Sequence, residues 1–386
     1  MPTSPTTLLL QTNGSENNRS MTRKQSIRFC HSSDGVRIAY ASVGRGPPLI
    51  KVANYLTHLE FDWESPVWRH WLDELSARHQ LIRYDERGCG LSDWDIDDFT
   101  LEAWITDLES VIKATGLQRF PLLGISQGGA VALAYAVRHP EKVTHLILYG
   151  AYSRGRLLRS KSPEHVQETE TLLDLMRAGW DQDNPAFRQV FATLFMPEAT
   201  ADQMSWFDEL QRRTTSPQNA IRFEEAFFSL DVTELAPEIT TPTLVLHARG
   251  DAMVPFEEGR RLAALIPGST FVPLESRNHI LLESEQAWRR FLEELHAFIA
   301  ESPLAVHPVK GGPIAALSSR EREVLELIAS GLGNAQIAKR LHISPHTLRN
   351  HITNVFSKLQ VETRAQAIVL AREAGLGRFE AKPQRF

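Results

Sequence analysis

A serine flanked by glycines lies between an apolar segment and a segment with helical periodicity. The run Gly124-Ile125-Ser126-Gln127-Gly128-Gly129 contains the pattern G-x-S-x-G. Between a strand and a helix, this pattern forms a sharp turn that exposes a nucleophilic serine hydroxyl. The glycines let strand and helix approach closely, and the amide of Gln127 then lies at the helix N-terminus, where it can stabilise an oxyanion. The pattern therefore predicts Ser126 as a nucleophile.

An acid and a base follow this serine in the order serine, acid, histidine. Asp251 comes after a predicted strand at residues 243–248, and His279 comes after the last predicted strand. Because active-site residues of α/β proteins gather at the carboxyl ends of the strands, we expect the three side chains to converge. His279 would be the general base, and Asp251 would orient its ring. Two uses stay open: catalysis of hydrolysis, or a polar cluster that only binds a ligand.

This arrangement resembles the α/β-hydrolase family over about residues 27–300, and residues 84–93 (YDERGCGLSD) are similar to a turn of that family. The resemblance implies a second oxyanion donor after the strand at residues 49–52, here the amide of Tyr55. Most such hydrolases carry His-Gly before that position, whereas this chain has Ala53-Asn54. Loss of one oxyanion donor typically lowers the rate about 10²–10³-fold, so this departure bears on whether the chain is a working enzyme.

The elements that position these residues are predicted from apolar runs that alternate with helical patterns. Strands rich in Leu, Ile and Val with helices between them predict an α/β fold whose parallel sheet is covered on both faces. After a hairpin at residues 27–42, strands are expected at residues 48–53, 80–84, 121–125, 145–149, 243–248 and 270–274. Residues 153–237 interrupt the alternation, and their helical patterning predicts a lid whose aromatic side chains fit either core packing or ligand contact.

Composition divides the chain into four parts. Residues 1–26 are rich in Ser, Thr and Asn and are predicted to be a disordered tail, followed by the hydrolase-like domain at 27–301. Residues 302–313 contain three prolines and a Gly-Gly pair, which is typical of a linker. The domain at 314–386 is basic: residues 310–386 carry a net charge of +6, and the rest of the chain −11. A polyanion partner for the basic part is one interpretation, and a solvated charged surface is the other.

The third of four helical patterns in the basic domain has a polar face. The Ser344-Pro345 pair starts this helix, which is expected to reach about residue 359. Its apolar positions share one face: Leu348, Ile352, Val355 and Leu359. The opposite face has no acidic residue and carries Thr347, Arg349, Asn350, Thr353, Asn354 and Lys358. Such a face suits the major groove of DNA, where Arg349 can read guanine and Asn350 adenine.

This segment resembles the LuxR-type helix-turn-helix family over nearly its whole length. Matching residues include 317–325 (LSSREREVL), Ile343-Ser344 and 347–352 (TLRNHI). The resemblance implies binding to double-stranded DNA and a dimer contact through the fourth helix at 362–374. Thr347 and Lys358 are expected to contact phosphates, and Asn334 is expected to cap the second helix. A helical bundle that contacts protein is the alternative.

Other features of the sequence restrict the location of the protein and its cofactors. Cys30 and Cys89 are the only cysteines and show no metal-ligand spacing, which fits a reducing cytoplasm. No apolar run approaches the ~18 residues that a membrane helix needs. We expect no metal and no cofactor.

Two functions fit these two halves. In the first, the chain is a homodimeric transcriptional regulator whose hydrolase-like domain senses a small apolar or aromatic molecule. In the second, that domain is an active serine esterase or carbon–carbon hydrolase that carries a DNA-binding tail. The first is favoured by analogy, because regulators commonly join a sensor to such a tail. The two functions are not exclusive.

Overall fold

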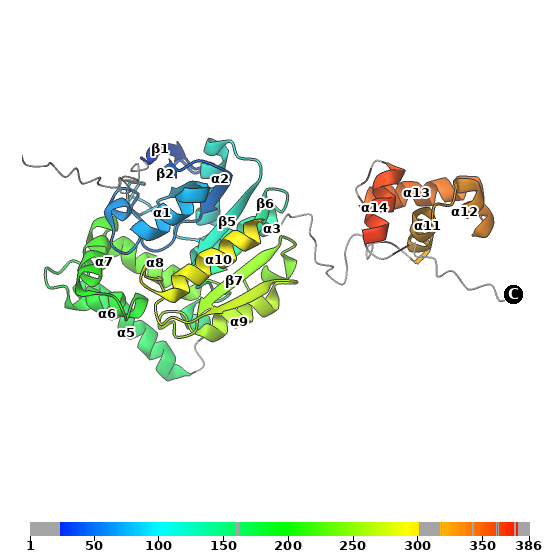
Figure 1. The fold of residues 1–386 in the computed structure, drawn as a ribbon. Helices are drawn as coiled ribbons and strands as arrows, with labels where there is room; N and C mark the ends of the chain where they lie inside the picture. The colour runs from blue at the N-terminus through cyan, green and yellow to red at the C-terminus, as the bar shows by residue number, and fades with distance from the viewer. Residues whose placement is uncertain are drawn as a thin grey trace, which may run out of the picture. The chain divides into compact units, whose positions relative to one another are not determined.

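A computed structural model describes residues 24–159 and 162–300 of the N-terminal part of the chain (Figure 1). In the C-terminal part it describes residues 317, 319–341, 343–359, 361, 363–373 and 376. The chain divides into two compact units, residues 1–303 and 304–386, each with its own hydrophobic clusters. Residues 1–23 of the predicted tail and all of the predicted linker at 302–313 lie outside the described residues.

The N-terminal unit is built on an eight-stranded sheet with the order β1-β2-β4-β3-β5-β6-β7-β8. The strands are β1 (Ser26–His31), β2 (Arg37–Val43), β3 (Pro48–Lys51), β4 (Gln80–Tyr84), β5 (Phe120–Ile125), β6 (Val143–Tyr149), β7 (Thr243–Ala248) and β8 (Thr270–Leu274). The β1–β2 and β2–β4 pairs are antiparallel, and all the others are parallel. Every residue of β5 and β7 is buried, as expected for parallel strands covered on both faces. The predicted α/β fold is confirmed.

Helices pack around this sheet. Outside the lid they are η1 (Phe61–Glu64), α1 (Arg69–Arg78), α2 (Leu101–Thr115), α3 (Gly128–Arg138), η2 (Ala236–Glu238), α9 (Phe256–Leu265) and α10 (Gln286–Ala300). Helices α1 and α10 meet through Trp71 and Trp288, whose ring centroids lie 4.5 Å apart, and Figure 1 shows both in front of the strands. Helices α2 and α3 are joined by the ion pair of Glu102 with Arg138.

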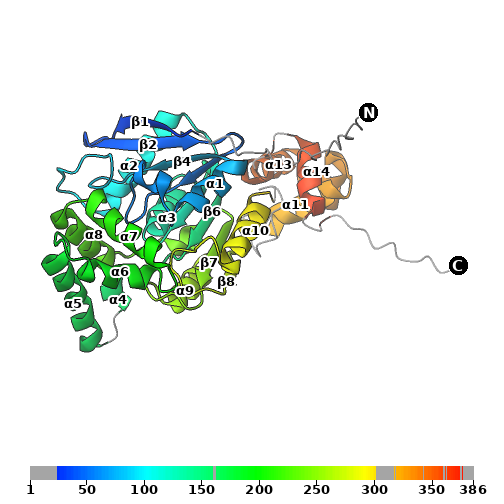
Figure 2. The ribbon, with the colours of Figure 1, turned by 60° about the vertical axis from the view of Figure 1, so that its left-hand side comes forward.

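In the described residues, five α-helices precede η2 between β6 and β7, where the sequence predicts a lid at residues 153–237. They are α4 (Arg156–Arg159), α5 (Pro163–Gly179), α6 (Ala186–Phe195), α7 (Ala201–Thr214) and α8 (Pro217–Ser229), gathered beside the sheet in Figures 1 and 2. Ser162, Thr200 and Ser216 begin three of them by accepting a hydrogen bond from a first-turn amide. The described residues of the lid form no strand, apart from an isolated bridge between Arg154 and Asp231.

The described residues of the C-terminal unit form four helices: α11 (Ser319–Ala329), α12 (Asn334–Arg340), α13 (Pro345–Leu359) and α14 (Arg364–Glu373). The predicted cap of α12 is wrong, because Asn334 is its first residue and Gly333 precedes it as the N-cap. The backbone amide of Gly333 donates to Oε1 of Gln336 at 2.9 Å. The side chain of a residue inside the helix therefore satisfies the N-cap amide.

Candidate functional site

Ser126 follows β5 in a strained turn. Its φ is 55°, in the left-handed region that residues other than glycine rarely adopt. The neighbouring glycines make the turn sterically feasible. A Cβ atom on Gly124 would lie 2.7 Å from Cα of Gly129, and one on Gly128 would lie 2.4 Å from the carbonyl oxygen of Ala53. The glycines of the motif are therefore positions where backbone segments approach too closely for any side chain.

Asp251 and His279 are in direct contact at the ends of β7 and β8. Nδ1 of His279 lies 2.7 Å from Oδ2 of Asp251, and Oδ1 of Asp251 accepts from the amides of Met253 and Val254 at 2.9 and 2.8 Å. Burial disfavours the charge of Asp251, but the charge and the hydrogen bond of His279 outweigh burial and lower the pKa of this carboxyl. An ionised Asp251 can therefore orient the imidazole ring.

The end of β6 brings Ser126 and His279 to one place. The amide of Ser126 donates to the carbonyl of Tyr149 at 2.9 Å. The next residue, Gly150, has a φ of 56°, and a Cβ atom there would lie 2.9 Å from Cε1 of His279. Nε2 of His279 is buried and has no hydrogen-bond partner among the described residues. Because the carboxylate of Asp251 only accepts, the neutral ring carries its proton on Nδ1, and Nε2 is left as a base.

The two residues predicted to form the oxyanion hole line the same pocket as Ser126. Gln127 is the N-cap of α3, so its amide belongs to the open end of that helix, which favours negative charge. Tyr55 lies after β3, in a segment where the ammonium of Lys51 donates to the side-chain oxygen of Asn54. Asn54 belongs to the Ala53-Asn54 pair, which stands where most such hydrolases carry His-Gly. The roles of both amides stay predictions.

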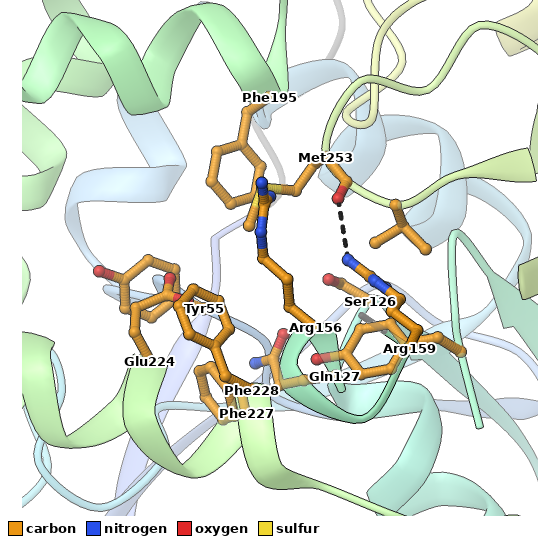
Figure 3. A pocket seen from close by; sticks show the side chains of 12 residues that line it. Tyr55, Ser126, Gln127, Arg156, Arg159, Phe195, Glu224, Phe227, Phe228 and Met253 are labelled. Atoms are coloured by element: carbon orange, nitrogen blue, oxygen red, sulfur yellow. Dashed lines mark hydrogen bonds between the residues drawn. The ribbon is translucent and has the colours of Figure 1, made fainter. Parts of the chain in front are cut away.

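The pocket around Ser126 is small and contains charged side chains (Figure 3). It is lined by Tyr55, Ser126, Gln127, Tyr152, Arg156, Arg159, Phe195, Glu224, Phe227, Phe228, Met253 and Val254, and its volume of about 20 Å³ is room for about one water molecule. Arg156, Arg159 and Glu224 are not among the site residues predicted from the sequence. Their sequence signal is weak: two arginines three positions apart after β6, and an acid among the phenylalanines of the lid.

Burial changes the ionisation of these charged groups. Glu224 is 2% exposed, and burial raises its pKa to about 8 although the charge of Arg156 opposes this shift. Burial also lowers the pKa of Arg156 and of Arg159. At neutral pH the carboxyl of Glu224 is therefore largely protonated, whereas guanidinium groups keep their charge.

Helix α13 presents the predicted polar face. Its residues Leu348, Val355 and Leu359 are buried. The exposed side chains include Thr347, Arg349, Thr353, Asn354 and Lys358. Asn350 also lies in α13, and its side chain lies outside the described part of the structure.

Lys358 has a second role besides the predicted phosphate contact. Its ammonium donates to Oε2 of Glu321 at 2.7 Å, which ties α13 to α11. The side chain of Glu321 is 7% exposed, whereas that of Lys358 is 42% exposed. A lysine that is paired within its own unit is less available to a phosphate, so the ion pair competes with the predicted contact.

In the described ranges, no three His, Cys, Asp or Glu side chains gather into a site that could hold a metal ion. None of the helices in those ranges combines the length and the apolar character that crossing a membrane requires. The expectation of no metal and no cofactor stays a prediction.

The sheet, the lid and the Ser126 site define a protein of the α/β-hydrolase class, and the C-terminal helices add a helix-turn-helix unit. The family model described as alpha/beta hydrolase fold matches residues 62–286, and that of bacterial regulatory proteins, luxR family, matches residues 315–371. The chain belongs to the alpha/beta hydrolase fold family and carries a C-terminal DNA-binding domain of the luxR family. Both resemblances found in the sequence are confirmed.

Similar proteins match mainly at low identity. The AB hydrolase superfamily protein YisY of Bacillus subtilis is 26% identical over 71% of this chain and 97% of its own length. The 2-hydroxy-6-oxo-2,4-heptadienoate hydrolase of Pseudomonas putida is 29% identical over 61% of this chain and 83% of its own length. The structure of an esterase from Exiguobacterium antarcticum covers 70% of this chain and 98% of that chain, with a TM-score of 0.59 and 24% identity, which shows the shared fold.

Proposed function

We propose that this chain is a sequence-specific transcriptional regulator whose hydrolase-fold unit senses a small molecule. The observation that carries the proposal is the combination, in one chain, of a luxR-family domain with a lidded pocket around Ser126. The exposed face of α13 offers hydrogen-bond donors without acidic residues, as readout of the major groove requires. We further propose that the protein is a homodimer and acts in the cytoplasm, where its DNA target lies.

Arg349 is the residue of this face best suited to read a base, because an exposed guanidinium can bind O6 and N7 of guanine together. Arg349→Ala should weaken binding to a DNA site selected with the wild-type protein by ~1–3 kcal/mol, and should relax selection at one base position. Fluorescence anisotropy with labelled duplexes measures both effects. Arg290→Ala, an exposed position of the other unit, is the control and should bind as the wild type does. Unchanged affinity and selectivity of Arg349→Ala would refute this role.

A second function, hydrolysis of the sensed molecule, is favoured by the φ of Ser126 and by the Asp251–His279 contact. In this proposal Nε2 of His279 takes the hydroxyl proton of Ser126 while Oγ attacks an ester carbonyl, and the amides of Gln127 and Tyr55 bind the oxyanion. The similar protein named as a 2-hydroxy-6-oxo-2,4-heptadienoate hydrolase supports hydrolytic chemistry for this unit.

Release of p-nitrophenol from p-nitrophenyl butyrate tests hydrolysis. We expect the wild-type protein to turn the ester over and Ser126→Ala to lose this activity. Ser110→Ala, which removes a hydroxyl on α2 that donates to the carbonyl of Thr106, should keep this activity. Absence of turnover across a panel of short-chain esters would reject hydrolysis and leave the sensor proposal standing.

A further inference from the structure

We propose that Arg156 and Arg159 bind a carboxylate of the sensed molecule, so that the ligand is a carboxylic acid with an apolar or aromatic body. This inference rests on the proposed sensor function and narrows its ligand to a chemical class. Both arginines belong to α4, the first helix of the lid, and both line the pocket around Ser126. In Figure 3 the side chain of Arg156 extends toward Phe195, and that of Arg159 toward Met253.

The two guanidinium groups are oriented by contacts from neighbouring elements. They lie three positions apart on one short helix, a spacing that places side chains on the same side. Nη2 of Arg159 donates to the carbonyl of Met253 at 3.3 Å, and its guanidinium lies 5.5 Å from the ring centroid of Tyr152. Nε of Arg156 donates to Oγ1 of Thr169 at 3.2 Å. Both groups are therefore held at the pocket by contacts from neighbouring elements.

Three buried donors of the pocket lining have no hydrogen-bond partner among the described residues. They are Nη1 of Arg159, Nε2 of Gln127 and the hydroxyl of Tyr55. Buried polar groups without partners are uncommon in folded proteins, and guanidinium and amide N–H groups can only donate. A ligand that satisfies them must present acceptors. A carboxylate presents acceptors alone, and its two oxygens match the planar fork of an arginine.

The charges that face the pocket also favour an anion. Among the lining residues, Arg156 and Arg159 are the cations, and Glu224 is the acid. Burial raises the pKa of Glu224 to about 8, so this carboxyl carries little negative charge at neutral pH. Glu258, which lies near Arg159 outside the pocket, is paired with Arg154 at 3.0 Å. Glu168 and Glu257 lie in an outer cleft beside the pocket.

The remainder of the pocket lining is apolar and defines the other end of the ligand. The rings of Phe195, Phe227 and Phe228 line the pocket together with the arginines. Phe227 packs against Tyr55 with ring centroids 5.9 Å apart, so these rings form a continuous aromatic wall. An acid with an aromatic or alkyl body would place its carboxylate on the arginines and its body against this wall.

The two arginines also separate this pocket from the outer cleft. The cleft has a volume of about 450 Å³ and shares Arg156, Arg159 and Met253 with the pocket, whose volume is about 20 Å³. Sites for small molecules usually occupy about 300–1,000 Å³, so a ligand fits the cleft but not the pocket as it stands. Glu168, Glu257 and Glu258 also line the cleft, so the two guanidinium groups are what a carboxylate in the cleft would bind. Their movement toward it would open the way to Ser126.

Isothermal titration of the purified full chain with 3-phenylpropionate and with its neutral amide, 3-phenylpropanamide, tests this proposal. The acid should bind at least about tenfold more tightly than the amide. Arg156→Gln and Arg159→Gln should each remove most of this preference, because the loss of a guanidinium weakens binding of the acid much more than binding of the amide. Arg159→Lys keeps the positive charge but loses the planar guanidinium, so it should keep part of the preference for the acid. Arg177→Gln removes an exposed lid arginine outside the pocket and should behave as the wild type does.

Thermal unfolding of each variant confirms that it is folded. Equal affinities for acid and amide, no saturable binding of the acid, or a preference that survives in both glutamine variants would overturn the proposal. Anisotropy with the selected DNA duplex, measured on the same samples, separates this result from the proposed function. A preference for the acid without any change in DNA affinity keeps the site and refutes sensing. Specific DNA binding without a preference for the acid refutes the carboxylate site alone.

Discussion

Glu224 is a carboxyl group placed among aromatic rings, and its ionisation is linked to folding. Burial raises its pKa from 4.5 to about 8, although Arg156 opposes the shift. A folded-state pKa above the unfolded value means that the folded chain holds its proton more tightly. The stabilisation from this group is therefore complete below about pH 4.5 and is lost as the pH rises through about 8.

Glu224→Gln should remove this loss of stability at higher pH, because the side-chain amide of glutamine does not ionise. Relative to the wild type, the free energy of unfolding of the variant should increase with pH between about 5 and 8, by at most ~1.4 kcal/mol per pH unit. Urea titrations of both proteins at several pH values in this range measure the difference. A difference that is constant across the range would show that Glu224 is ionised in the folded protein.

Residues of the site differ in how far the sequence predicts them. Ser126, Asp251 and His279 each follow an apolar strand, so the order of elements suffices to place them at one edge of the sheet. Arg156 and Glu224 lie on lid helices, where charged side chains usually face solvent. Only the packing of α4 and α8 over the pocket shows that these two are enclosed.

At the scale of elements, the turn between β5 and α3 depends on close backbone contacts. The contact of Gly128 with the segment after β3 matters most for the site, because that segment carries Tyr55. A Cβ atom on Gly128 would lie 2.4 Å from the carbonyl oxygen of Ala53, and this backbone oxygen cannot move unless the segment after β3 moves with it.

Gly128→Ala should therefore lower the free energy of unfolding by about 1–3 kcal/mol, the usual cost of overpacking. Urea titration followed by circular dichroism measures this change. Gly333→Ala is the control, since the nearest atom to its new Cβ is 3.7 Å away, and it should cost no more than about 1 kcal/mol, the loss expected when Ala replaces Gly at an N-cap. Equal stability of Gly128→Ala and the wild type would mean that the segment after β3 is free to shift.

The ends of elements are predicted less well than their existence. A strand is expected at residues 48–53, whereas β3 ends at Lys51, its last partner of β4. The amide of Val52 still bonds to the carbonyl of Leu123, so the apolar run continues beyond the strand into the loop before Tyr55. In α12, the choice of Asn334 as a cap failed because Gly333 holds the N-cap position, and Oδ1 of Asn334 accepts from Nη1 of Arg364 at 2.9 Å. The end of β3 depends on strand partners that are distant in the sequence, and the cap of α12 depends on competition between side chains. A local sequence pattern shows neither.

At the scale of the whole molecule, the proposed sensor function requires two units with separate cores to influence each other. A ligand in the Ser126 pocket changes DNA binding only if it binds one arrangement of the units more tightly than another. In the proposed dimer, contact through α14 would use residues such as Val369, which is 54% exposed. Two copies of α13 would then read two half-sites about one helical turn of DNA apart.

The most direct test of sequence-specific regulation is to sequence the genomic DNA fragments that the purified full chain binds. We expect enrichment of one shared motif with two half-sites about 10 base pairs apart, and loss of selection at one position of each half-site in Arg349→Ala. Fragments without any shared motif, retained equally by the wild type and by Arg349→Ala, would contradict the proposed function.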